Sequence, residues 1–107
     1  MEERVLVSLL LDFYGPLLTE KQRLSLQWHH EDDMSLGEIA DELGVSRQAV
    51  HDNLNRARHI MNEYESKLHL VEQYEKREQL LGELKTMLPP DVLSQPRMQQ
   101  VLTQMEG

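Results

Sequence analysis

Hydrophobic residues recur at helical spacing along most of the chain. Near the N-terminus the apolar positions fall at i, i+3, i+4 and i+7, and they are Leu6, Leu9, Leu10 and Phe13. Gly15-Pro16 then predicts a helix end. No alternation of apolar and polar residues at period 2 persists, and Leu, Glu, Gln, Lys and Met dominate. We therefore expect an all-α fold whose first helix runs from about Glu3 to Tyr14.

A capping-box pattern marks the start of a second helix. Thr19 is followed three residues later by Gln22, so that hydroxyl and amide can each bond an otherwise unpaired backbone N–H group. We expect this helix to point Leu24 and Trp28 inward. Its periodicity is lost in the polar segment 29–33, which predicts a solvated connector.

The pattern at residues 35–58 predicts two helices joined by a tight turn. Ser35 begins a second capping box, and Ser46 is placed to cap the following helix. Gly44 can take the left-handed conformation that ends a helix, and Ala40 is small where the two helices must touch. This spacing is typical of a helix-turn-helix, whose helices cross at about 90–120°. The alternative is an ordinary helical hairpin.

The apolar pattern continues along the fourth helix well beyond this motif. Seven residues follow one another at spacings of four and three, and they are Val50, Leu54, Ala57, Met61, Tyr64, Leu68 and Val71. After Val71 the pattern slips by one position and residues 72–79 are mostly polar, so either the seam changes register or the helix bends. Pro89-Pro90 must end this helix, and the apolar residues beyond it predict a final helix that folds back.

An apolar seam on so long a helix needs a surface to cover it. We expect a second copy of the chain to provide that surface, packing through the fourth helix and the C-terminal segment. The seam residues assigned to this homodimer are Met61, Tyr64, Leu68 and Val71. The alternative is cover within one chain by the helix after Pro96.

Length and cysteine content limit the architecture. A chain of 107 residues is long enough for one domain, which we divide into a helical core at 3–62 and a helical tail at 63–107. Cysteine is absent, so disulfides and thiolate metal sites are excluded and a cytoplasmic location is expected. The apolar run Val5–Leu11 is shorter than a membrane span and lacks the features of a signal peptide, so we expect no membrane association.

The distribution of charge points to one region for contact with nucleic acid. The net charge is −8, the wrong sign for a protein that coats polyanions without specificity. Within residues 44–62, however, three arginines oppose the single carboxylate of Asp52, a local charge of +2. The candidate nucleic-acid-binding residues are therefore Arg47, Gln48, His51, Asn55, Arg56 and Arg58.

These side chains have the chemistry to read a major groove. Arginine can bond guanine or a phosphate, and Gln48 or Asn55 can pair with adenine. Asp52 is a misfit, because its carboxylate repels phosphate unless it accepts from a cytosine amino group or pairs with Arg56 four residues on. We expect the pairing with Arg56. The alternative is that the whole face is merely solvated.

No catalytic or metal site is predicted, so the protein is not expected to be an enzyme and no cofactor is implied. Glycine-rich phosphate loops, nucleophile elbows and paired acid–base groups are absent from the sequence. His29 and His30 adjoin three carboxylates, but adjacent side chains point apart and a solvated loop explains them. The remaining histidines, His51, His59 and His69, are expected at the surface.

Several stretches resemble a known family. The helix-turn-helix resembles region 4 of bacterial sigma factors, and residues 5–90 are similar to the YlxM family. The stretches that carry the resemblance are Phe13-Tyr14, Leu17 to Gln22, Asp33 to Val50, Asp52-Asn53 and Lys67-Leu68-His69. At Asn53 the chain departs from the sigma-like pattern, which usually has a buried apolar residue there; Leu54 takes the inward place.

The resemblance implies a DNA-binding protein whose gene usually lies beside that of the signal recognition particle GTPase. It assigns the recognition role to Arg47, Gln48, His51 and Arg56, and it brings no catalytic residues. We therefore expect a regulatory protein that binds double-stranded DNA as a dimer. The alternatives are an adapter that binds protein or RNA of the signal recognition particle without reading DNA sequence, and a structural scaffold that binds no nucleic acid.

Overall fold

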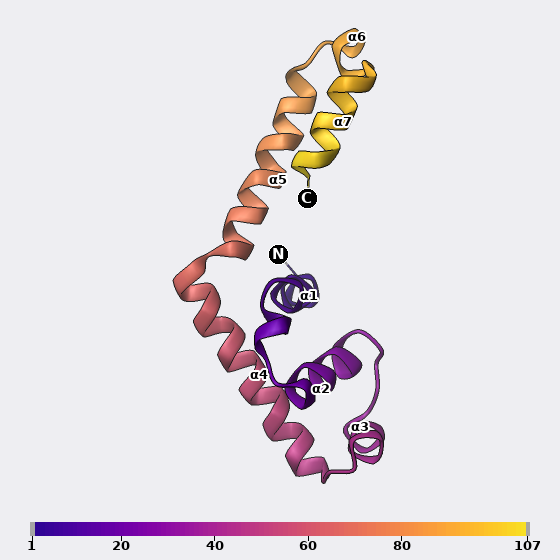
Figure 1. Ribbon diagram of the computed structural model, residues 1–107, viewed down its shortest axis with the longest axis vertical. Coiled ribbons are helices and arrows are strands. Elements are labelled where there is room, and N and C mark those ends of the chain that lie inside the picture. The colour runs from indigo at the N-terminus through magenta and orange to yellow at the C-terminus, as the bar shows by residue number, and fades with distance from the viewer. Residues whose placement is uncertain (1, 107) are drawn as a thin grey trace. The chain divides into compact units, whose positions relative to one another are not determined.

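In a computed structural model, which describes residues 2–106, the chain is all-α as expected, with no strand in that range. By their contacts the residues form two compact units, one that extends to Val71 and one that begins at Glu72. We call them the N-terminal unit and the C-terminal unit. Figure 1 shows the order of the helices, which the next paragraphs describe unit by unit.

The N-terminal unit packs three shorter helices against one long one. These are α1 (Glu3–Tyr14), α2 (Glu20–His30), α3 (Leu36–Leu43) and α4 (Arg47–Leu68), with a 3₁₀ turn at Gly15–Leu17. The core between them includes Tyr14, Leu26 and Ile39, each fully buried. Their burial removes apolar surface from water, which is the main favourable contribution to folding.

The sequence signals for helix ends in this unit are confirmed. In both capping boxes the side-chain oxygen of Thr19 or Ser35 accepts from the backbone N–H three residues on, and the reciprocal bond is present. Gly44 ends α3 with φ of 66°, the left-handed conformation that favours glycine. Ser46 caps α4 by accepting from the backbone N–H of Ala49 at 3.0 Å.

Two inward faces differ from the sequence prediction. In α1 the buried residues are Val7, Leu10, Leu11 and Tyr14, one position from the predicted set, whose members Leu6, Leu9 and Phe13 are only partly buried. In α2 the buried leucine is Leu26, whereas Leu24 is half-buried. The predicted connector was also too long, because α2 includes His29 and His30.

The long helix ends before the place where the sequence suggested a bend. The chain leaves α4 at His69, which has φ of 55°, and α5 (Leu70–Met87) begins at the next residue. The break is therefore a single left-handed residue that precedes the polar segment 72–79. A left-handed residue other than glycine is uncommon and costs backbone energy.

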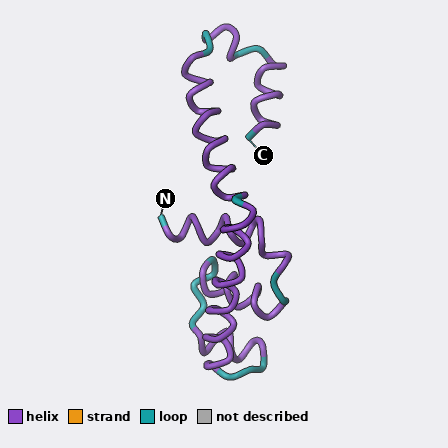
Figure 2. The backbone as a smooth tube through the Cα atoms, turned by 90° about the vertical axis from the view of Figure 1, so that its left-hand side faces the viewer, coloured by secondary structure: helices purple, strands orange, loops and turns teal. Residues whose placement is uncertain are grey.

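In the C-terminal unit, α5 and α7 form a helical hairpin. The predicted final helix is divided into a short α6 (Pro90–Leu93) and α7 (Pro96–Met105). Figures 1 and 2 both show α7 running beside α5 in the opposite direction, so the predicted fold-back is confirmed. The buried apolar residues of this unit are Leu81 and Leu102.

Candidate nucleic-acid interface

The helix-turn-helix consists of α3, the residues Gly44 to Ser46, and the first turns of α4. The backbone N–H groups of Gly44 and Val45 both donate to the carbonyl oxygen of Ala40, which satisfies the C-terminal end of α3. Ala40 is buried in the core, together with Ile39 of α3 and Val50 of α4. This packing fixes where α4 begins and leaves its first turns facing solvent.

The six predicted nucleic-acid-binding side chains are all exposed. The opposite side of α4 buries Val50, Leu54, Ala57 and Met61 in the core. At about 100° of rotation per residue, Gln48, His51 and Asn55 fall within a sector of about 60°, which we call the recognition face. Arg56 lies about 80° outside that sector and so does not share the recognition face.

Hydrogen bonds link neighbouring side chains on and beside the recognition face. The amide Nε2 of Gln48 donates to Oδ1 of Asp52 at 3.1 Å, and the amide of Asn55 lies 3.4 Å from Nδ1 of His51. The expected pairing of Asp52 with Arg56 is therefore wrong, since Asp52 bonds the residue four positions earlier. Gln48 keeps its carbonyl oxygen and a second amide N–H, which are the acceptor and donor that reading a base requires.

Arg47 makes a contact that the sequence did not predict. A β-carbon added to Gly37 would lie 3.1 Å from both Nε and Nη2 of Arg47, so the guanidinium packs against the backbone of α3. Gly37 leaves the room for it. The only sequence signal was a glycine inside the first turn of a helix, where it is otherwise unfavourable.

The electrostatic surroundings of the recognition face are mixed. The exposed residues of α3 include the carboxylates of Glu38, Asp41 and Glu42, and α3 packs directly against α4. A nucleic acid on the recognition face would therefore contact α4 in preference to the acidic surface of α3.

Arg58 is placed apart from the other candidates. It lies eleven residues beyond Arg47, or about 16 Å along the helix, which exceeds the width of a major groove. It lines a shallow depression of about 340 Å³ together with Arg4, His29 and His30. Glu3 and Asp33 line the same depression, so Arg58 lies apart from Arg47 in surroundings of mixed charge.

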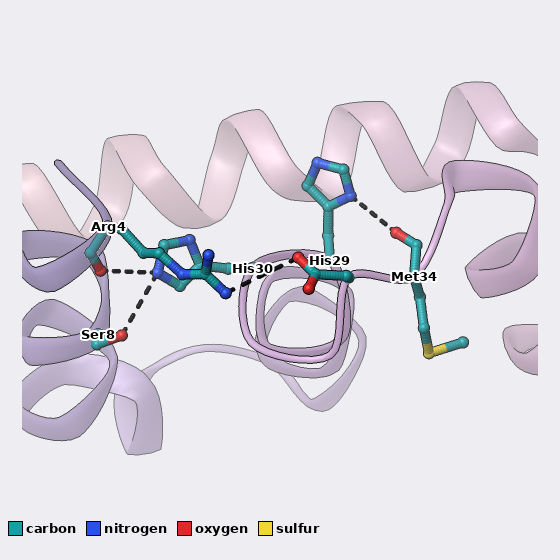
Figure 3. Close-up of polar contacts among 6 residues, drawn as sticks. Arg4, Ser8, His29, His30 and Met34 are labelled. Atoms are coloured by element: carbon teal, nitrogen blue, oxygen red, sulfur yellow. Dashed lines mark hydrogen bonds and ion pairs between the residues drawn. The ribbon is translucent and has the colours of Figure 1, made fainter.

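The histidine pair at the end of α2 has a structural role. His29 donates from Nδ1 to the carbonyl oxygen of Met34 at 3.0 Å, and His30 donates from Nε2 to that of Arg4 at 2.8 Å. Figure 3 shows the two rings bonding in different directions, with Ser8 near His30. The prediction of a solvated loop was wrong, because both side chains are half-buried and tie α2 to its neighbours. Within residues 2–106 no cluster of three or more potential metal ligands forms.

The predicted dimer residues divide into two pairs. Met61 and Val71 are buried in the core of their own unit. Tyr64 and Leu68 are 36% and 47% exposed, and the ring of Tyr64 stacks on that of Tyr14 at 5.9 Å. Of the four predicted dimer residues, Tyr64 and Leu68 keep exposed surface and Met61 and Val71 do not.

Comparison with known proteins identifies relatives over nearly the whole chain. Residues 1–101 match the model of the family UPF0122, described as "Putative helix-turn-helix protein, YlxM / p13 like". A UPF0122 protein of Shouchella clausii is 48% identical over 91 residues, covering 85% of this chain and 84% of the relative. One of Bacillus mycoides is 42% identical over 106 residues, covering 99% and 96%. No helix among residues 2–106 is long and apolar enough to cross a membrane.

Proposed function

The chain belongs to the UPF0122 family of YlxM / p13-like proteins, and we propose that it is a DNA-binding regulatory protein of the cytoplasm that inserts the start of α4 into a major groove. The observation that carries this proposal is the recognition face. Its three side chains are exposed and polar, and they follow directly on a capped turn that α3 holds against the core. A helix-turn-helix reads DNA through the N-terminal part of its second helix. The proposal includes no catalytic step.

The side chains divide into base-reading and phosphate-binding groups. Gln48 and Asn55 carry amides, which can bond adenine through both a donor and an acceptor. Arg47, at the first position of α4, is placed to bond guanine or a phosphate, and Arg56 to neutralise a phosphate beside the groove. His51 lies between the two amides; its Nδ1 accepts from the amide nitrogen of Asn55, which leaves Nε2 as the donor of the ring.

The net charge of −8 determines how much non-specific affinity for DNA the protein can have. Non-specific affinity for DNA comes almost entirely from phosphate neutralisation, and an acidic protein gains little of it. Affinity must therefore come from base contacts on the recognition face. We expect a large ratio of specific to non-specific binding, with a salt dependence set by the few phosphate contacts of residues such as Arg56.

Selection from random duplex DNA with the full chain tests this proposal. We expect one enriched motif, and Gln48→Ala should lose about 1–3 kcal/mol of discrimination at a single base pair of it. Arg56→Ala should instead weaken binding to all sequences and lower the salt slope by about one. The matched controls are Gln99→Ala and Arg97→Ala, at exposed residues of α7. Absence of any enriched motif would contradict the proposal.

A second candidate is an adapter that binds protein or RNA of the signal recognition particle. The exposed carboxylates of α3 favour it, because a surface with both signs of charge suits a protein partner better than a duplex. The association with this particle comes from the family resemblance alone. Pull-down of its components, run beside the DNA selection at the same salt, separates the two candidates. Capture without an enriched motif would favour the adapter.

A further inference from the structure

The helical hairpin of the C-terminal unit has an apolar surface that its own residues do not cover. Its buried apolar side chains are Leu81 of α5 and Leu102 of α7. Four further large apolar residues are exposed: Leu80 at 54%, Leu84 at 38%, Met87 at 78% and Met105 at 46%. The exposed large apolar residues of this unit thus outnumber its two buried ones, and a group of exposed apolar side chains marks an interaction surface.

These exposed residues lie on one face of the hairpin. On α5, Leu80, Leu84 and Met87 fall about 60–120° to one side of Leu81. On α7, the partly buried Val101 and the exposed Met105 fall about 60–100° from Leu102 in the same rotational sense. Because α5 and α7 run in opposite directions, an equal sense of rotation brings both sets to the same face. We call these five residues the open face.

The opposite face of the hairpin is polar. There the ammonium of Lys85 pairs with the carboxylate of Glu106. Gln99 and Thr103 line a shallow depression of about 260 Å³ beside that pair. The hairpin is therefore a two-helix layer with one wet side and one apolar side, and such a layer is stable when a second layer covers the apolar side.

We propose that the open face binds the open face of a second copy of this chain, so that two hairpins form a four-helix bundle. Leu80, Leu84 and Met87 follow at spacings of four and three, which is the seam spacing of paired helices. Two identical layers related by a two-fold axis bury the same residues on both sides. The inference goes beyond the proposed function and does not depend on nucleic acid.

The charges beside the open face fit a second copy. Lys76 and Glu83 lie on the same side of Leu80, about 40° and 60° around the helix from it. Neither has an ion-pair partner in the part of the chain that the structure describes, and seven residues separate them, about 10 Å along the axis. Antiparallel pairing of two α5 helices about Leu80 brings Lys76 of one copy to Glu83 of the other. This complementarity points to self-association rather than a different partner.

The interface differs from the one that the heptad spacing of α4 suggested. Met61 and Val71 are already buried by their own chain, so that seam has no room for a partner at those positions. The proposed dimer interface is instead the open face, which includes no residue of α4.

Sedimentation of the full chain without nucleic acid is the first test. We expect a dimer at about 10 μM protein. Leu80→Glu and Leu84→Glu should give monomers, because each buries a charge in the proposed bundle while remaining exposed in a single chain. Gln99→Glu on the polar face is the matched control and should leave the dimer intact. Circular dichroism verifies that every variant keeps its helix content. A monomeric wild type, or a dimer that survives both glutamate variants, overturns the proposal.

Cross-linking gives a second, independent test, since the chain has no cysteine. Leu80→Cys places one thiol near the proposed two-fold axis, where the Cβ atoms of two copies can approach the distance of about 4 Å that a disulfide needs. Mild oxidation should convert most of this variant to a covalent dimer. Gln99→Cys, on the polar face, should remain largely monomeric under the same conditions. Equal cross-linking of the two variants would contradict the proposed face.

Discussion

Gly37 illustrates how a single residue can serve the interface at some cost to the fold. Glycine in a helix is about 0.8–1.0 kcal/mol less favourable than alanine. The three atoms nearest to an added methyl group all belong to the flexible end of Arg47. We therefore expect Gly37→Ala to stabilise the protein by about 0.5–1 kcal/mol in urea unfolding, while it displaces the guanidinium and weakens DNA binding.

Gly82 offers the matched control for this prediction. It lies in α5, and a β-carbon added there would meet nothing within 4 Å. Gly82→Ala should give a similar gain in stability with DNA affinity unchanged. If Gly37→Ala lowered the stability, the helix would need glycine at that position for a reason other than the space for Arg47.

Asp52 sets the charge beside the recognition face. Asp52→Asn keeps an oxygen that can accept from Gln48 and removes one negative charge. An exposed charge near a phosphate contributes about 1 kcal/mol, so we expect affinity for the selected DNA to rise about fivefold in a fluorescence anisotropy titration. Asp91→Asn, at an exposed residue of α6, is the control. A loss of affinity with Asp52→Asn would show instead that this carboxylate accepts from a base.

Three hydrogen bonds, two of them to the distant residue Tyr14, hold the break between α4 and α5. The hydroxyl of Tyr14 donates to Oε1 of Glu65 at 2.6 Å and accepts from the backbone N–H of Leu70 at 3.3 Å. The same carboxylate oxygen accepts from the N–H of Val71 at 2.9 Å. The first residues of α5 would otherwise leave these donors unpaired. Tyr14 and Glu65 therefore stabilise the left-handed turn at His69.

Removing the hydroxyl of Tyr14 should weaken this junction in a way that depends on pH. Burial raises the pKa of Tyr14, and the hydrogen bond to Glu65 raises it further. The folded state thus favours the neutral phenol, and its contribution is complete below pH of about 10 and is lost as the pH rises above that value. Tyr14→Phe should cost about 1–3 kcal/mol at pH 7.

Urea unfolding between pH 7 and 11 tests this prediction. The difference in the free energy of unfolding between wild type and Tyr14→Phe should shrink above pH of about 10. Tyr64→Phe, at a tyrosine that is 36% exposed, should change the stability less. If the difference stays constant up to pH 11, the pKa of Tyr14 does not differ between the folded and the unfolded state.

Signals carried by neighbouring residues were enough to predict the starts and ends of most helices. Both capping boxes and the turn at Gly44 depend on residues within one helical turn, and all three are confirmed. The end of α4 at His69 was missed because its hydrogen bonds join residues 51 and 56 positions apart. In α1 a run of three leucines, Leu9–Leu11, fits two registers equally well, and only the packing of α2 and α4 selects between them.

The candidate site was predictable in part for the same reason. Exposure of the recognition face follows from the buried spacing of Val50, Leu54 and Ala57, which is a property of one helix. The choice of Gln48 over Arg56 as the partner of Asp52 was not predictable, because both lie four residues away and both can donate. The contact between Gly37 and Arg47 joins two helices, so no local pattern indicates it.

At the scale of the whole molecule, the two proposals together define how DNA would be read. A two-fold dimer carries two helix-turn-helix units, so its target should contain two half-sites in inverted orientation. The dimer would also carry twice the net charge of −8, which further disfavours non-specific contact with phosphate. Simultaneous engagement of both half-sites must supply the affinity.

A comparison of one-site and two-site duplexes tests this coupling. Once one helix-turn-helix of a dimer is bound, the second meets its half-site at an effective concentration in the millimolar range, so the avidity gain can reach about 10²–10⁴-fold. We expect the wild type to bind the two-site duplex at least about a hundredfold more tightly than the one-site duplex. Leu80→Glu should lose that gain and keep the one-site affinity, because Leu80 lies outside the recognition face. If Leu80→Glu is monomeric yet keeps the full two-site affinity, the hairpin is not what joins the two half-sites.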